Sequence, residues 1–283
     1  MVKERIGLTG IEINAVMHCN LACAGCSHAS PVSPGWNADP LQVKRDLDDL
    51  GTAADVREMR VVGGEPLLHP DLAGLLAAIR ASGAGAGSML RVITNGTRLG
   101  RVGWSWLDYV DEVYVSVYPH AAIDAEALRE LIERGRLSGK HIGVNRYKHF
   151  RPVLPAQRLT AEETAAVFET CQVAHAWSCH TVQDGYVYMC PMTVTAGPGA
   201  AGTPTNRCAI APVETIAVRL RAFLGRRDPL PECSSCLGTV GELTLHRQAN
   251  RRTWRPLSVS TVDWAQVERI RADPWASNSC VDE

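Results

Sequence analysis

Three cysteines and two histidines fall within eleven residues near the start of the chain, in the segment HCNLACAGCSH at 18–28. Cys19, Cys23 and Cys26 have the spacing C-x3-C-x2-C and follow an apolar run. Three thiolates on one loop can ligate three irons of a four-iron cluster and leave the fourth iron open to a small molecule. The same thiolates could instead hold zinc, with His18 or His28 as the fourth ligand, because C-x2-C also occurs in structural zinc sites.

The other seven cysteines all lie in the second half of the chain: Cys171, Cys179, Cys190, Cys208, Cys233, Cys236 and Cys280. The first residues show no signal peptide, and no run of about 18 uncharged apolar residues occurs, so we expect a cytoplasmic protein without a membrane partner. Thiols stay reduced in the cytosol. Ten cysteines therefore indicate metal binding, catalysis or burial rather than disulfides.

The composition favours a globular protein that recognises its ligands through local sites. The chain has 283 residues, 46% of them hydrophobic, which suffices for one large core or for a core and a small lobe. The formal net charge is -1, from 29 basic and 30 acidic residues. No long-range field attracts nucleic acid or an anionic membrane, so we expect neither as a partner.

Short apolar runs alternate with amphipathic stretches up to about residue 150, which is typical of a parallel α/β fold. We expect strands at 10–17, 58–62, 90–94, 112–117 and 141–145, and helices at 40–54, 70–82, 104–109 and 124–134. Ligands of such folds bind at the carboxyl ends of the strands. The first cysteine loop follows the first expected strand and therefore lies at that edge.

Polar or flexible motifs follow the other expected strands: VVGGEP at 61–66, ITNGT at 93–97, SVYP at 116–119 and VNRY at 144–147. The glycines of the first motif allow the backbone to approach a ligand, and Glu65 could bind an ammonium group. Each motif alone is a common strand-to-helix turn. Their order and their shared position at one edge indicate a single site.

This combination resembles the radical S-adenosylmethionine (radical SAM) enzymes, a family recognised by C-x3-C-x2-C after the first strand and GGEP after the second. The resemblance implies a partial (β/α)6 barrel whose 4Fe-4S cluster, held by Cys19, Cys23 and Cys26, binds S-adenosyl-L-methionine. A flavodoxin or ferredoxin type donor of low potential would then supply the electron that forms a 5'-deoxyadenosyl radical. The implied cofactor contacts are Gly63, Gly64, Glu65, Pro66, Thr94, Asn95, Ser116 and Asn145. The family usually has an aromatic residue where this chain has Gly25, so adenine needs another apolar contact.

The second half is predicted to contain helices at 160–171 and 212–224 and a two-residue hairpin at Asp184-Gly185. A cysteine, this hairpin and a later C-x2-C resemble the twitch lobe, a partial SPASM domain that holds an auxiliary 4Fe-4S cluster. The implied ligands are Cys171, Cys190, Cys233 and Cys236, with Cys179 and Cys208 as alternatives. A structural zinc site of Cys190, Cys208, Cys233 and Cys236 is the competing interpretation. We expect a barrel at 1–155, this lobe at 156–246, and an extension at 247–283 that packs on the barrel.

In length and cysteine spacing the chain resembles the carbohydrate and aminocyclitol dehydrogenases and epimerases of aminoglycoside biosynthesis. We predict hydrogen abstraction from a carbinol carbon of a polyhydroxylated substrate, followed by electron transfer to the auxiliary cluster and ketone formation. An epimerase would instead return hydrogen from a thiol, with Cys208 as the candidate donor. Two other hypotheses are a peptide-modifying maturase and a zinc-stapled, nucleic-acid-binding module that uses the Trp-bearing stretch at 247–275.

Overall fold

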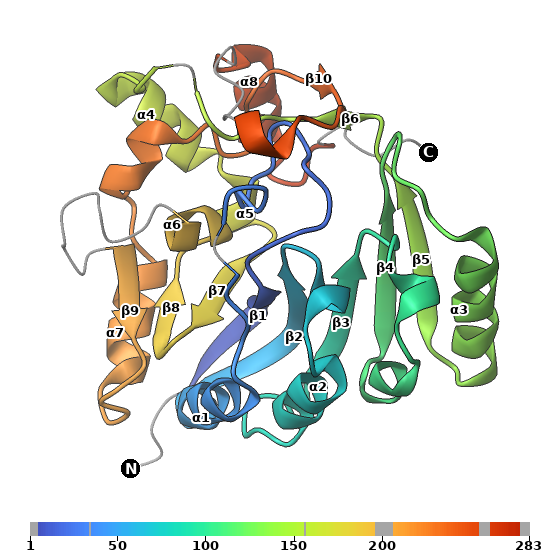
Figure 1. The fold of residues 1–283 in the computed structure, drawn as a ribbon. Coiled ribbons are helices and arrows are strands. Elements are labelled where there is room, and N and C mark those ends of the chain that lie inside the picture. The colour runs from blue at the N-terminus through green and yellow to red at the C-terminus, as the bar shows by residue number, and fades with distance from the viewer. Residues whose placement is uncertain (1–4, 34, 156, 196–205, 255–260, 278–283) are drawn as a thin grey trace.

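The computed structural model describes residues 5–33, 35–155, 157–195, 206–254 and 261–277, and it is built around one eight-stranded sheet. The strand order is β5-β4-β3-β2-β1-β7-β8-β9 (Figure 1). The strands are β1 (Ile6–Val16), β2 (Ala54–Gly63), β3 (Met89–Thr94), β4 (Glu112–Val117), β5 (His141–Arg146), β7 (His180–Gln183), β8 (Tyr186–Tyr188) and β9 (Arg207–Ala209). The six from β5 to β7 in this order are parallel, and β8 and β9 are antiparallel. The predicted α/β fold with a mostly parallel sheet is confirmed.

The sixth parallel strand, β7, pairs with β1 rather than with β5. The chain leaves β5 through the short β6 (His149–Phe150), which pairs with β10 (Thr244–Leu245) in a separate small sheet. It then returns to the other side of β1. Asp184 and Gly185 have φ of 49° and 80° and form the predicted two-residue turn between β7 and β8. The sheet thus continues from the expected barrel into the expected lobe, whose boundaries stay a prediction.

The α-helices of the described residues are α1 (Pro40–Gly51), α2 (Leu72–Arg80), α3 (Ala125–Leu137), α4 (Ala161–Glu169), α5 (Gln172–His175), α6 (Pro191–Thr195), α7 (Ile216–Leu224) and α8 (Trp264–Ala272). Side chains cap the first turns of five of these eight helices, α1, α2, α3, α4 and α8. Helix α2 begins two residues later than predicted because Asp71 is its N-cap and accepts a hydrogen bond from Gly74 N at 2.9 Å. Among the described residues, none of these helices is long and apolar enough to cross a membrane.

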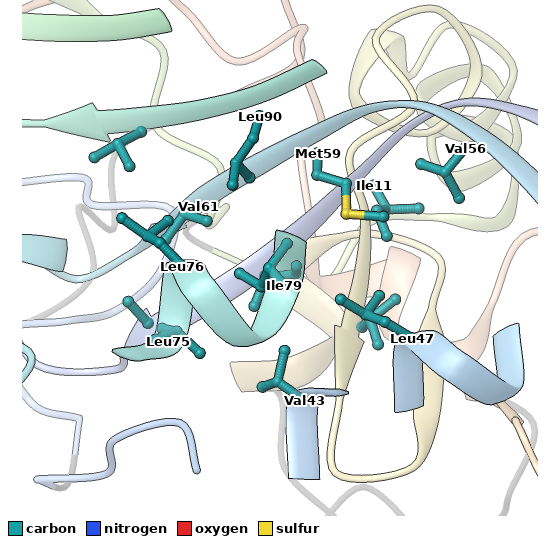
Figure 2. Close-up of a cluster of buried hydrophobic side chains, with 14 of the residues drawn as sticks. Ile11, Val43, Leu47, Val56, Met59, Val61, Leu75, Leu76, Ile79 and Leu90 are labelled. Atoms are coloured by element: carbon teal, nitrogen blue, oxygen red, sulfur yellow. The ribbon is translucent and has the colours of Figure 1, made fainter. Parts of the chain in front are cut away.

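The main hydrophobic core lies between the sheet and helices α1 and α2 (Figure 2). Ile11, Met59, Leu47 and Leu75 are fully buried in it. Each such side chain contributes about 2 kcal/mol of hydrophobic stabilisation. Because side chains alternate along a strand, Glu12 points to the face opposite Ile11. One face of the sheet therefore packs against the helices through apolar side chains, and the opposite face carries polar side chains such as Glu12.

Candidate active site

A cavity of about 400 Å³, the first cavity hereafter, lies beside the carboxyl ends of β1 to β4. The predicted site residues that line it are Cys19, Cys23, Cys26, Gly63, Gly64, Thr94, Asn95 and Ser116. Glu65, Pro66 and Asn145 do not line it. The fold thus brings most of the predicted residues together although they come from four separate strand ends.

Two glycines let the ends of β1 and β2 touch. Gly64 N donates to Val16 O at 2.8 Å, and a Cβ at Gly64 would lie 1.8 Å from His18 O. Gly63 has φ of 121°, and its Cβ would lie 2.1 Å from Val16 O. Any side chain here would push the cysteine loop away from β2, so backbone packing explains the glycine pair.

Glu65 links the end of β2 to the end of β3 through hydrogen bonds. Its fully buried carboxylate accepts hydrogen bonds from Leu67 N at 3.0 Å, Thr94 Oγ1 at 2.5 Å and Asn95 N at 2.7 Å. Burial raises its pKa, and these three donors oppose that shift. Glu65 thus positions Thr94 and Asn95, and its predicted contact with an ammonium group stays a prediction.

A segment far along the sequence, residues 247–254, holds the cysteine loop, and we call it the strap. Gln248 accepts from Ala22 N at 2.9 Å and donates to the Cys23 thiol at 3.4 Å. Trp254 donates its indole N–H to Cys23 O at 3.0 Å. We expected the stretch from residue 247 to pack on the barrel, but no local signal identified these individual contacts, because more than 220 residues separate the partners. The strap fixes the loop backbone at Ala22 and Cys23.

The thiols of the loop fit a metal cluster in donor chemistry. Burial raises the pKa of Cys19 to about 12 and that of Cys23 to about 11, so both are neutral thiols until a cation binds. His28 lines the same cavity with Nε2 buried and unpartnered. Within the described ranges, no three His, Cys, Asp or Glu side chains form a group that could hold a single metal ion such as zinc. A four-iron cluster is larger than one ion and takes thiolates that lie farther apart.

A cavity of about 350 Å³, the second cavity, is lined by the four cysteines predicted for the auxiliary cluster, Cys171, Cys190, Cys233 and Cys236. Cys171 is the N-cap of α5, Cys190 precedes α6, and the other two lie at a short 3-10 helix (Pro231–Ser235). Burial raises the pKa of Cys190 well above its usual range, and the other three thiols raise it further. Four mutually close thiols from three segments thus meet in one place.

The two cavities adjoin. Ser27, Met192 and Gly238 line both of them. Ser27 directly follows the third cysteine of the first loop, and Met192 lies in α6, which begins after Cys190. A group bound in one cavity therefore lies no more than one residue away from the other cavity.

The remaining thiols are distributed differently from the prediction. Cys208 lies on β9 opposite Val187 and packs in the main core, so the prediction of Cys208 as the hydrogen donor is wrong for this fold. Cys179, which we predicted only as an alternative ligand or spare thiol, lines the first cavity and not the second. Arg60 Nη1 donates to its sulfur at 3.2 Å. Cys280 lies outside the described residues.

Other walls of the first cavity come from the predicted SVYP and VNRY motifs, which supply Tyr118 and Tyr147, and from Phe150 and Glu12, which we did not predict. Tyr118, Tyr147 and Phe150 form an aromatic group there, with ring centroids of Tyr118 at 5.6 Å from Tyr147 and 5.4 Å from Phe150. These rings offer the apolar surface that adenine would need, which Gly25 does not supply. Glu12 also lines the cavity, and a carboxylate inside the apolar strand GIEINAV was the signal that could have identified it.

Residues 13–149 match the family model described as the radical SAM superfamily, so this part of the chain is similar to a radical SAM domain. Among curated proteins, GTP 3',8-cyclase 3 of Mycobacterium bovis is 33% identical over 104 residues, which cover 35% of this chain and 28% of that protein. This chain spans less than a third of the length of the curated relatives it matches.

Two solved structures resemble the chain over most of its length. One is BtrN in complex with AdoMet and 2-DOIA, at 14% identity and a TM-score of 0.46, covering 79% of this chain and 84% of that one. The other is anSMEcpe with bound AdoMet and the Cp18Cys peptide, at 11% identity and a TM-score of 0.46, covering 92% and 95%.

Proposed function

We propose that this chain is a radical SAM oxidoreductase that converts a carbinol carbon of a sugar or aminocyclitol to a ketone. The observation that carries the proposal is the pair of adjoining cysteine-lined cavities, one with the three thiols of the loop and Cys179, the other with the four predicted auxiliary ligands. A 4Fe-4S cluster and S-adenosyl-L-methionine in the first cavity would supply a 5'-deoxyadenosyl radical, which takes the carbinol hydrogen atom. An external donor of low potential, of the flavodoxin or ferredoxin type, would deliver the initiating electron in the cytoplasm.

The two cavities would have different functions, binding of the first cluster and the cofactor in one and acceptance of an electron in the other. Cys19, Cys23 and Cys26 would hold the first cluster, with Gly63, Gly64 and the Thr94–Asn95 turn beside the cofactor. The substrate must then lose a proton from its hydroxyl group and one electron to become a ketone. Cys171, Cys190, Cys233 and Cys236 would hold a fully ligated auxiliary cluster in the adjoining cavity, which can accept that electron.

Epimerisation is the second candidate, because one thiol outside both predicted ligand sets, Cys179, lines the first cavity. A hydrogen atom from this thiol would invert the carbon. The resulting thiyl group would then need one electron from the auxiliary cluster and one proton. The two reactions share hydrogen abstraction and differ in whether the substrate radical loses an electron or gains a hydrogen atom.

The test is product analysis with reduced, reconstituted enzyme, S-adenosyl-L-methionine and a set of aminocyclitols and amino sugars in D2O. For a dehydrogenase, the double variant Cys233→Ala/Cys236→Ala should still form 5'-deoxyadenosine, while ketone formation falls to background. Cys208→Ala, a change in the core away from both cavities, should leave both products. Ketone at the wild-type level in the double variant would contradict the proposal. An inverted product with solvent deuterium that depends on Cys179 would establish epimerisation instead.

A further inference from the structure

A row of charged side chains crosses the inner face of the sheet, opposite the hydrophobic core. The strand register places one residue of each strand beside the next, in the order Thr181 on β7, Glu12 on β1, Arg60 on β2, Arg91 on β3 and Glu112 on β4. Glu58 joins the row from β2 and contacts both arginines. The row contains three carboxylates and two guanidinium groups and thus has one negative charge in excess.

Two of the three carboxylates are closely paired. Arg91 lies 2.6 Å from the Glu58 carboxylate and 2.5 Å from that of Glu112. Arg60 Nε lies 3.2 Å from Glu58 as well. These short, charge-assisted contacts neutralise the carboxylates of Glu58 and Glu112.

Glu12 is the least compensated member of the row. Among the described residues, it forms one ion pair, with Arg60 Nη1 at 3.7 Å. The hydrogen bonds of Arg60 go elsewhere, to Trp177 O at 2.6 Å, Ser178 O at 3.1 Å and the Cys179 sulfur at 3.2 Å. Burial raises the pKa of Glu12, whereas Arg60 and a hydrogen bond from the Cys179 thiol oppose that shift. Of the three carboxylates, Glu12 has the longest contact with a guanidinium group.

Glu12 is also the member of the row that lines the first cavity. Among the described residues of that lining, the other permanently charged side chain is Arg151, which is already paired with Asp263 at 3.0 Å and Gly241 O at 2.7 Å. The first cavity thus presents one buried carboxylate whose ion pair, to Arg60, is 3.7 Å long.

An ammonium group is the ligand that this carboxylate lacks. It would supply both a positive charge and hydrogen-bond donors, whereas a hydroxyl group supplies a donor alone. Glu12 precedes the end of β1 by four residues, or roughly 13 Å. That depth separates it from the glycine pair at the strand ends, beside which we place the cofactor.

We infer that Glu12 forms a subsite for a protonated amine of the substrate. The inference rests on the proposed function and narrows it: the substrate is an amino sugar or aminocyclitol rather than a neutral polyol. The amine would be anchored deep in the cavity, and the reacting carbon would face the cysteine loop.

The test compares matched amine and hydroxyl compounds, scyllo-inosamine with scyllo-inositol and glucosamine with glucose, by calorimetric titration of the unreduced, reconstituted enzyme at pH 7. At least one amine should bind wild type about tenfold or more tightly than its hydroxyl partner. Glu12→Gln should remove that preference and leave S-adenosyl-L-methionine affinity unchanged within about twofold. Glu112→Gln, in the same row but outside the cavity lining, is the matched control and should keep the preference. Circular dichroism checks that both variants fold.

Three results would overturn the inference. The first is wild-type enzyme that binds neither amine better than its hydroxyl partner, which requires no variant. The second is an equal loss in Glu12→Gln and Glu112→Gln, which indicates a structural role for the row. The third is weakened S-adenosyl-L-methionine binding in Glu12→Gln, which assigns the carboxylate to the cofactor. Formation of 5'-deoxyadenosine is measured in parallel, so failure of the proposed function is seen separately from failure of the amine subsite.

Discussion

The two cysteine-lined cavities are constructed in opposite ways. The three predicted ligands of the first come from eight consecutive residues of one loop, Cys19 to Cys26. The second takes four thiols from three segments between Cys171 and Cys236, which meet only after the chain has folded. A local set of three leaves one metal position for a small molecule, whereas four thiols leave none. The difference suits one cavity to chemistry and the other to electron transfer.

The surroundings of the thiols differ in the same sense. Asn95 and Gln248 donate hydrogen bonds to thiols of the first set, at 3.6 Å and 3.4 Å. Val167, Phe168 and Leu230 are among the side chains around the second set. The thiols of the first set thus have amide donors beside them, and those of the second set have several apolar side chains nearby.

The largest effect that separates the two regions is expected for Gly64→Ala. The new Cβ would lie 1.8 Å from His18 O, so the cysteine loop must move away from β2. We expect a loss of about 3 kcal/mol in the free energy of unfolding and loss of iron from the first cavity alone. Urea unfolding and iron analysis measure both. Gly87→Ala, where no atom lies within 4 Å of the new Cβ, is the control and should be nearly neutral. Equal iron loss from both cavities would contradict the expectation that this change affects the first cavity alone.

A smaller effect is expected for Gln248→Ala in the strap. The change removes hydrogen bonds to Ala22 N and to the Cys23 sulfur. Two such bonds are worth about 1.5 kcal/mol, so a chelator should remove iron from the first cavity about tenfold faster. The exposed Gln157→Ala is the matched control. The rate of iron loss, measured in a Cys233→Ala/Cys236→Ala background, reports the first cavity alone. An unchanged rate would show that the strap does not hold the loop.

The smallest effect concerns the second region. Thr160 forms a capping box with Glu163 at the start of α4, the helix that precedes Cys171. Thr160→Ala should cost about 1 kcal/mol, visible as faster hydrogen exchange in α4 with the first cavity unaffected. Glu162→Ala changes the same turn outside the capping box and should cost less. A larger effect on the cysteine loop at 18–28 than on α4 would contradict the separation of the two regions.

The sequence predicted what depends on local periodicity and missed what depends on distant pairing. Strands β1 to β5 were predictable because alternating apolar residues bury one face, and Asp184-Gly185 identified its hairpin through turn chemistry. The pairing of β7 with β1 joins residues about 170 positions apart and has no local signal. The same reason hid the strap.

The site residues show the same limit. Cysteine spacing selected the four thiols of the second cavity, but it could not place Cys208 in the core or Cys179 in the first cavity. The motif of Glu65 suggested a ligand contact, but it could not show the hydrogen bonds from Thr94 and Asn95, which depend on the packing of β2 beside β3. Residue type predicts which chemistry is available, and only the packed strands decide which atoms remain free for it.

The most direct test of the central claim is the metal content of anaerobically reconstituted protein. Iron, sulfide and zinc per chain would be measured for wild type, for the Cys19, Cys23 and Cys26 triple alanine variant, and for the Cys233→Ala/Cys236→Ala variant. Two clusters predict about eight irons in wild type and about four in each variant. About four irons in wild type that fall to none in the triple variant would leave the second cavity without an electron acceptor and would contradict the proposed oxidation.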